Sequence, residues 1–161
     1  MRVVILALAL ACACGGTQGG SGMRAPVRLV LPAVDGGEID VTAYRDKVVV
    51  LHVFTTWSLA ATGDVPQLTA ADDREDTVVV GIATDPEGST VVVPWRKALG
   101  VRYLIAIADD GFRRGDTQLG RVAAVPATIV LDHGGAIARR IDRQLAPGEL
   151  TATIDEVISS R

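Results

Sequence analysis

The chain has 161 residues, 48% of them hydrophobic and 4% aromatic, which is enough for one domain built around a single core. Its 16 Lys and Arg residues against 19 Asp and Glu give a net charge of -3 without a basic block, which argues against a nucleic-acid partner. The two cysteines are Cys12 and Cys14, so residues 15–161 offer no thiol for a disulfide or a thiolate metal site, and we expect neither a metal nor another cofactor.

The N-terminal residues have the layout of a signal peptide. Arg2 precedes an apolar run over residues 3–10, and small residues ending in Cys14 follow. The run is much shorter than the roughly 20 residues of a membrane-spanning helix. A small-residue stretch ending in cysteine resembles the lipobox of bacterial lipoproteins, which implies that Cys14, or alternatively Cys12, is acylated and anchors the chain to a membrane. An ordinary cleaved signal and a translation start at Met23 are the other interpretations.

These features divide the chain into three parts. Residues 1–14 are interpreted as the signal peptide with its lipobox-like end, residues 15–24 as a glycine-rich flexible tether, and residues 25–161 as the folded domain. We therefore expect an exported cell-envelope lipoprotein whose domain lies on the periplasmic or extracytoplasmic side.

The folded domain alternates strand and helix patterns. It opens with short apolar runs on either side of Asp35-Gly36-Gly37, which is typical of a hairpin. Strands are predicted over residues 26–31, 38–41, 47–54, 77–84, 101–109, 127–131 and 136–141. Helices are predicted over residues 58–69, from about residue 92 or 93 to 99, within 110–120, and over 148–160. Pro94 sets the start of the second helix, because proline is tolerated only in a first turn. This order predicts an α/β fold with a mixed central sheet, helices on both faces and an N-terminal hairpin.

Four segments of this pattern resemble a known family. They are residues 26–46, the strand over 48–57 that ends in Thr56-Trp57, the strand over 78–85, and residues 125–135 with Val125-Pro126 at their start. Together they resemble the TlpA-like branch of the thioredoxin superfamily, whose members are membrane-anchored thiol-disulfide interchange proteins. The resemblance implies a thioredoxin-like fold from about residue 25 to the C-terminus.

The resemblance fails where the family performs its chemistry. Where the family has C-x-x-C, this chain has Ser58-Leu59-Ala60-Ala61, so the two active-site cysteines fall on Ser58 and Ala61. A serine hydroxyl forms no mixed disulfide and alanine has no reactive atom, so we expect no dithiol redox chemistry and assign no catalytic residue. Ser58 is interpreted as the N-cap of the following helix. A serine hydrolase is disfavoured because the glycines of a nucleophile elbow are missing.

Pro126 matches the cis-proline that faces the active-site turn in thioredoxin folds, and we predict a cis bond here on that resemblance. The backbone of Val125 would then be free to pair with an extended peptide. We therefore predict a binding groove of Trp57, Ser58, Val125 and Pro126. A purely structural role for Pro126 is the alternative.

The remaining ionisable candidates have structural interpretations. His52 is interpreted as a hydrogen-bonded core residue, and His133 belongs to a turn. Two histidines without a nearby cysteine or H-x-x-x-H spacing argue against a transition-metal site. Asp64 and Asp116 are interpreted as solvated helix residues rather than acid-base groups.

The leading hypothesis from the sequence is a non-catalytic binding or accessory module that holds an extended polypeptide, such as an envelope protein or peptide. One alternative is a thiol-disulfide oxidoreductase of the TlpA-like or redoxin family in the broad sense. A relative that has lost all activity is a second alternative.

Overall fold

The computed structural model describes residues 25–160. The predicted signal peptide, Cys12, Cys14, the tether and Met23 lie outside the described residues.

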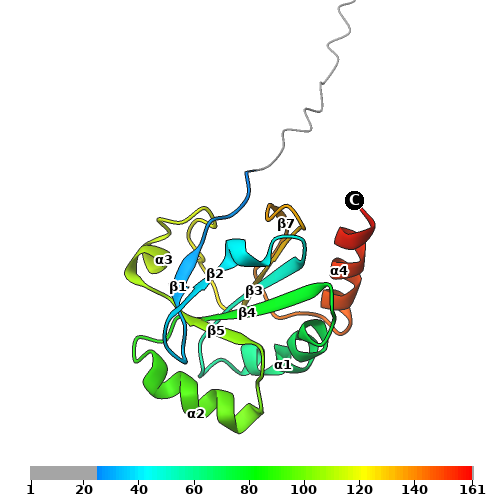
Figure 1. The fold of residues 1–161 in the computed structure, drawn as a ribbon. Helices are drawn as coiled ribbons and strands as arrows, with labels where there is room; N and C mark the ends of the chain where they lie inside the picture. The colour runs from blue at the N-terminus through cyan, green and yellow to red at the C-terminus, as the bar shows by residue number, and fades with distance from the viewer. Residues whose placement is uncertain (1–24, 161) are drawn as a thin grey trace, which may run out of the picture.

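A five-stranded mixed sheet forms the centre of the domain (Figure 1). Its strands, in the order β5-β4-β3-β6-β7, are Leu104–Ile107, Thr77–Ala83, Val48–Phe54, Ala127–Leu131 and Ile137–Ile141. β3 lies in the middle, parallel to β4 and antiparallel to β6, with Val53 paired to both Ile82 and Ala127. Every residue of β3 is buried, as its run of β-branched and large apolar side chains predicts.

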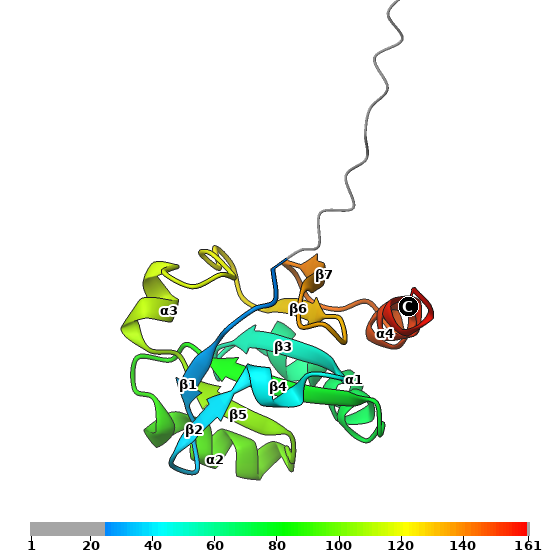
Figure 2. The same cartoon turned by 45° about the horizontal axis from the view of Figure 1, so that its top comes forward.

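Helices cover both faces of the sheet (Figures 1 and 2). One face packs against α1, α2 and α4, which are Leu59–Asp72, Ser89–Leu99 and Glu149–Ser159. The other face packs against α3, the hairpin strands β1 and β2, and a 3-10 turn, which are Asp110–Arg114, Val30–Pro32, Glu38–Asp40 and Val41–Tyr44. The predicted mixed sheet, with helices on both faces and an N-terminal hairpin, is confirmed.

Successive side chains of β3 point to opposite faces of the sheet. Val49, Leu51 and Val53 belong to the apolar cluster with the hairpin and α3, whereas Val50 and Phe54 belong to the cluster with α1, α2 and α4. His52 lies between Val50 and Phe54 on the same face of β3. Its side chain therefore points toward α1.

Two helices differ from the sequence-based expectation. α2 begins at Ser89, so Pro94 lies inside the helix and the predicted start at residue 92 or 93 is wrong. Packing compensates for the missing backbone donor, because Val92 is buried and the Trp95 ring stacks on Phe54 with centroids 4.7 Å apart. α1 runs through Pro66, as the predicted range of residues 58–69 requires, but it ends at Asp72 instead of residue 69.

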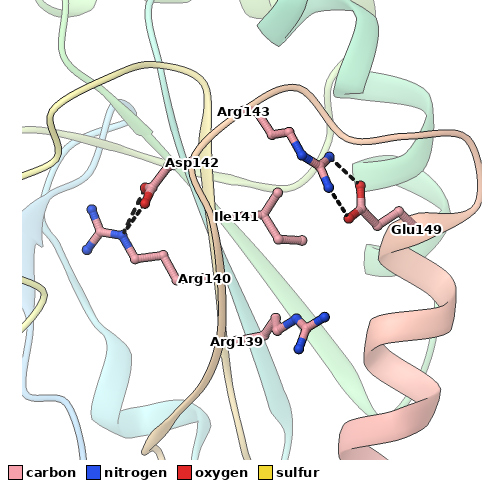
Figure 3. A pocket seen from close by; sticks show the side chains of 6 residues that line it. All are labelled: Arg139, Arg140, Ile141, Asp142, Arg143 and Glu149. Atoms are coloured by element: carbon pink, nitrogen blue, oxygen red, sulfur yellow. Dashed lines mark hydrogen bonds and ion pairs between the residues drawn. The ribbon is translucent and has the colours of Figure 1, made fainter.

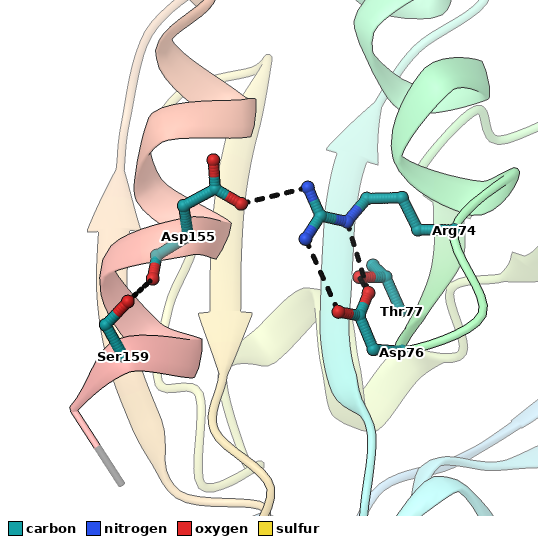
Figure 4. Close-up of polar contacts among 5 residues, drawn as sticks. All are labelled: Arg74, Asp76, Thr77, Asp155 and Ser159. Atoms are coloured by element: carbon teal, nitrogen blue, oxygen red, sulfur yellow. Dashed lines mark hydrogen bonds and ion pairs between the residues drawn. The ribbon is translucent and has the colours of Figure 1, made fainter.

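Arg74 joins three elements at the C-terminal end of α1 (Figure 4). Its guanidinium group bonds Asp76, just before β4, at 3.1 Å and Asp155 of α4 at 3.0 Å. These ion pairs are partly exposed and each contributes only about 0–1 kcal/mol, but they set the position of α4 beside α1. Within residues 25–160, no helix has the length and apolar character needed to cross a bilayer.

Candidate functional site

The turn between β3 and α1 is fixed by a buried carboxylate from another loop. Asp85, which follows β4, accepts the Thr56 N–H at 3.0 and 3.1 Å and the Thr56 hydroxyl at 2.6 Å. Arg113 in turn donates to the Asp85 carbonyl at 3.1 Å. Because Asp85 is buried, these charge-assisted hydrogen bonds are stronger than exposed ones. They fix the position of Thr56, the residue that precedes Trp57.

Ser58 caps α1, as predicted. Its backbone is extended, its Oγ accepts the Ala61 N–H at 3.2 Å, and its carbonyl accepts the Thr62 N–H at 3.0 Å. Ala61 is buried against the core at the position where the family has its second cysteine. The local geometry of the turn is therefore intact around two side chains that contain no sulfur.

Two large apolar side chains on this turn are left in solvent. Trp57 is 74% exposed and Leu59 is 88% exposed. Trp57 was a predicted groove residue, whereas Leu59 was missed, because no pattern in the sequence distinguishes an exposed leucine in a first helical turn from a buried one. Together they form an apolar projection at the N-terminal end of α1.

Val125-Pro126 lies next to the turn and its peptide bond is cis, as predicted. Val53 pairs with Ala127 in the antiparallel β3-β6 register, so Thr55, just after β3, and Val125, just before β6, lie at the same end of the sheet. A pocket of about 130 Å³ lies beside this point; it is lined by Val53, Thr84, Phe112, Arg113, Val122 and Val125. Trp57 and Ser58 lie outside that pocket, so the four predicted groove residues share one end of the sheet but not one cavity.

The interpretation of Asp64 as a solvated residue is wrong. Asp64 has no exposed surface, and one of its carboxylate oxygens lies 4.0 Å from His52 Nε2. Its other oxygen accepts the Leu145 N–H at 3.1 Å. His52 is a hydrogen-bonded core residue, as predicted, with Nδ1 3.1 Å from Thr128 Oγ1. The structure thus places an ionisable pair beneath the turn, one helical turn beyond Ala61.

Burial changes the pKa values of both members of this pair. Loss of solvation raises the pKa of Asp64 to about 6; the Leu145 N–H opposes this rise and the negative charge of Glu149 adds to it. Loss of solvation lowers the pKa of His52 to about 4. Both shifts favour the uncharged forms in the core.

The sequence did contain a signal for this pair. The buried positions of α1 are Ala61, Asp64, Val65, Leu68 and Ala71, a helical stripe with spacings of three and four residues. Asp64 lies on that stripe, and His52 has the same strand parity as the residues of β3 that face α1. Combining the two periodicities would have indicated that Asp64 is buried and faces His52.

A second pocket lies between β7 and α4 and is lined largely by charged residues (Figure 3). It has a volume of about 490 Å³ and is lined by Arg139, Arg140, Ile141, Asp142, Arg143 and Glu149. Arg143 forms a two-point ion pair with Glu149 at 2.7 and 2.8 Å, and Arg140 bonds Asp142 and the Leu119 carbonyl. Two of the three guanidinium groups are therefore already used within the chain: Arg143 fastens the segment after β7 to the start of α4, and Arg140 ties β7 to residues 119 and 121.

The other two ionisable residues considered in the sequence, Asp116 and His133, lie away from the turn. Asp116 is exposed and bonds Arg114 at 2.8 Å, but it follows α3 rather than lying in a helix. His133 is in the turn before β7, where its carbonyl accepts the Asp46 N–H. Among residues 25–160, no group of three or more His, Cys, Asp or Glu side chains is arranged to hold a metal ion.

Comparison with solved structures shows what this domain resembles. A DsbF homologue from Corynebacterium diphtheriae superposes with a TM-score of 0.75 at 26% identity, covering 87% of this chain and 96% of its own. A thiol:disulfide interchange protein from Chlorobium tepidum has a TM-score of 0.72 at 19% identity, covering 84% and 97%. StoA from Bacillus subtilis has a TM-score of 0.64 at 16% identity, covering 81% and 98%. No protein-family model and no curated protein matches the chain.

These neighbours confirm two predictions from the sequence. The domain has the thioredoxin-like fold, and its structural neighbours are TlpA-, DsbE- and DsbF-like thiol-disulfide interchange proteins of the thioredoxin family. The chain has the capped helix and the cis-proline described above, with Ser58 and Ala61 at the two positions that the sequence resemblance matched to the family's cysteines.

Proposed function

We propose that this thioredoxin-fold chain, a structural relative of the TlpA-like thiol-disulfide interchange proteins, is a non-catalytic binding module that holds an extended polypeptide at the turn carrying Trp57 and Ser58. The bound segment would contact the projecting side chains of the turn and pair with the backbone of Val125, which precedes the cis-proline. Its partner would be an envelope protein or peptide.

The exposure of Trp57 and Leu59 is the observation that carries this proposal. Two large apolar side chains two positions apart in sequence, 74% and 88% exposed, gain little from burial in the isolated domain. The turn that presents them is nevertheless held rigidly by buried Asp85 through Thr56. A rigid turn with a projecting aromatic side chain binds a partner at a low cost in conformational entropy.

Chemistry at this turn is restricted by the atoms present. Disulfide exchange needs a thiolate that attacks sulfur, and the folded domain has no cysteine. Ser58 Oγ is engaged as the helix cap, and His52, the nearest imidazole in sequence, is buried and bonded to Thr128. Neither arrangement supplies the activated nucleophile that a serine enzyme requires.

The competing function is thiol-disulfide oxidoreduction in the broad family sense, with thiols supplied by a partner. The structural neighbours described as disulfide oxidoreductases favour it at the level of the family. Faster reduction of a disulfide substrate by an added dithiol when the purified chain is present, with Cys12 and Cys14 both replaced by serine, would rank this function above peptide binding.

We propose further that the domain acts outside the cytoplasm and is anchored by an acyl chain on Cys14, with Cys12 as the alternative. The signal-like N-terminal sequence supports this, and one structural neighbour is described as a secreted disulfide oxidoreductase of Mycobacterium tuberculosis. Metabolic labelling with an alkyne fatty acid should label the wild-type chain and the C12S variant but not C14S. Label that persists in C14S and is lost in C12S would move the anchor to Cys12.

The binding function is tested by site-specific crosslinking in the native envelope. A photoreactive residue in place of Ser58 should yield a discrete crosslinked product. The matched control carries the same residue at Glu75, which is exposed at the opposite end of α1, about 20 Å away along a 14-residue helix. Equal labelling from both positions, or none from position 58, would contradict the proposal.

A further inference from the structure

The His52-Asp64 pair is a buried polar feature that the binding function does not use. His52 has 1% of its surface exposed and Asp64 none, and they come from β3 and α1. Their facing atoms, His52 Nε2 and Asp64 Oδ2, are 4.0 Å apart and have no hydrogen-bond partner among residues 25–160. A buried polar atom left without a partner lowers the stability of the folded state, so this gap needs an explanation.

The groups around the pair limit where charge can be placed. From β6, Thr128 offers only a hydroxyl to His52, and the Phe54 ring stacks on the imidazole at 6.1 Å. From α4, Glu149 adds negative charge near Asp64, although it is bonded to Arg143. Tyr103, just before β5, is buried; loss of solvation raises the pKa of its phenol, and the charges of Asp72 and Asp64 of α1 add to the rise. None of these neighbours supplies a cation in direct contact with Asp64.

We propose that the His52-Asp64 pair is a proton switch in which the carboxyl group, not the imidazole, takes up the proton, and that this proton controls how firmly residues 142–148 are held against α1. In solution the order is the reverse, because a free imidazole binds a proton at higher pH than a free carboxylate does. Here both side chains are buried. The attraction between a charged imidazole and a carboxylate 4.0 Å apart is too weak to offset the loss of their solvation, so the neutral acid beside a neutral imidazole is the favoured form.

The hydrogen-bond geometry is consistent with both states. With Asp64 ionised, the imidazole tautomer protonated on Nε2 faces the carboxylate, and Nδ1 accepts from the Thr128 hydroxyl. Uptake of one proton from solvent at Nδ1, with transfer of the Nε2 proton to Asp64 Oδ2, then brings the charge of the pair from -1 to 0. In that state Nδ1 donates to Thr128, and the protonated Oδ2 faces the lone pair of Nε2, so each facing atom gains a partner as the gap closes.

The pair is connected to the surface through Leu145. The Leu145 N–H donates to Asp64 Oδ1 at 3.1 Å, and it lies in the segment between β7 and α4. The same segment packs closely on α1, because a Cβ at Gly63 would lie only 2.6 Å from Gln144 Nε2. A hydrogen bond to a carboxylate is stronger than one to a neutral acid, so protonation of Asp64 loosens this segment. Gly63 is four residues after Leu59, and the switch therefore acts next to the proposed binding turn.

The test uses NMR spectroscopy of the full-length, isotope-labelled chain between about pH 7.5 and about pH 5, a range that spans the ordinary titration of imidazole. We expect the Asp64 carboxyl carbon to titrate while the His52 ring stays neutral, its protonated nitrogen changing from Nε2 to Nδ1. Since the chain has only two histidines, a His133→Gln variant assigns the His52 signals.

Hydrogen exchange in the same samples tests the link to the surface. After correction for intrinsic exchange, protection of the Leu145 amide should fall about 5-fold at the lower pH. The Thr42 amide is the matched control, because it lies outside residues 142–148 and donates at 2.8 Å to Asp40, whose pKa is held below its usual range by hydrogen bonds from the Thr42 hydroxyl and N–H. A positively charged His52 ring beside an ionised Asp64, or unchanged protection of Leu145, would overturn the proposal. The outcome does not depend on whether the turn binds a peptide.

Discussion

Asp85 holds Thr56 through both the backbone N–H and the hydroxyl of that residue, across 29 positions of sequence. The carboxylate is buried at the end of β4, and Thr56 immediately precedes the exposed Trp57. The turn proposed to bind a peptide is thus positioned by the neighbouring parallel strand rather than by its own residues. These hydrogen bonds make the short connection between β3 and α1 rigid, although its side chains face solvent.

Replacement of Asp85 by asparagine should destabilise the domain by about 1–3 kcal/mol, because an amide gives up one of the oxygens that accept from Thr56 and the charge that strengthens both bonds. Urea unfolding followed by circular dichroism measures the loss. Asp116→Asn is the matched control, since Asp116 is exposed and bonds only the exposed Arg114, and its effect should stay within about 0.5 kcal/mol. Equal effects of the two substitutions would show that Asp85 does not anchor the turn.

Replacing Trp57 and Leu59 together by alanine should leave the free energy of unfolding within about 1 kcal/mol of the wild type, because both side chains are mostly exposed. Crosslinking from position 58 should fall about 5- to 30-fold, as expected for the loss of an aromatic anchor at an interface. Val93→Ala removes another exposed apolar side chain, on α2, and should leave crosslinking unchanged. A large loss of stability in the double variant would instead indicate a structural role for the two side chains.

The pH dependence of stability should show the contribution of His52 alone, or of Asp64 alone, once the other residue is replaced. In Asp64→Asn, the remaining His52 has a folded-state pKa of about 4, below its unfolded value of 6.5, so stability is fully present above about pH 6.5 and falls as the pH drops toward 4. In His52→Gln, the remaining Asp64 has a folded-state pKa of about 6, above its unfolded value of 3.8, so stability is greatest near pH 4 and falls as the pH rises through 6.

The two variants should therefore have opposite slopes relative to the wild type, each spanning up to about 3 kcal/mol. In the wild type the two contributions nearly cancel, because the folded and unfolded states each take up about one proton between pH 7 and pH 5. Urea midpoints at several pH values measure the differences, and groups that the variants share with the wild type cancel. Parallel slopes in the two variants would contradict the assigned direction of at least one pKa shift.

Installing cysteine at both Ser58 and Ala61, in a chain whose Cys12 and Cys14 are replaced by serine, should restore a redox-active disulfide. Ser58 Oγ already lies at the N-terminus of α1, where the helix lowers the pKa of a thiol, and Ala61 N–H points at that oxygen. Thiol titration before and after reduction, together with a disulfide-reduction assay, measures the gain. The Ser58→Cys single variant should show one free thiol and no turnover. A folded double variant that keeps two free thiols would mean that the turn is not arranged as described.

Local patterns in the sequence were sufficient for the elements of this domain. The β-branched run at Val48–Phe54 predicted a central strand, the Asp35-Gly36-Gly37 turn predicted the hairpin, and Val125-Pro126 predicted the cis bond through the family resemblance. The start of α2 was missed because Pro94 was judged by helix propensity alone. The packing of Val92 and Trp95 outweighs that local penalty, and such packing depends on residues far away in the sequence.

The sequence by itself determined the fold class and the absence of a thiol from residues 15–161, because periodicity and composition are properties of a segment or of the whole chain. Only the tertiary structure decided that Asp64 is buried against His52, that Asp85 binds Thr56, and that Trp57 and Leu59 stay in solvent. Each of these depends on which faces of separate elements meet. Burial and hydrogen bonding follow from that meeting, since solvation is lost only where two surfaces come together.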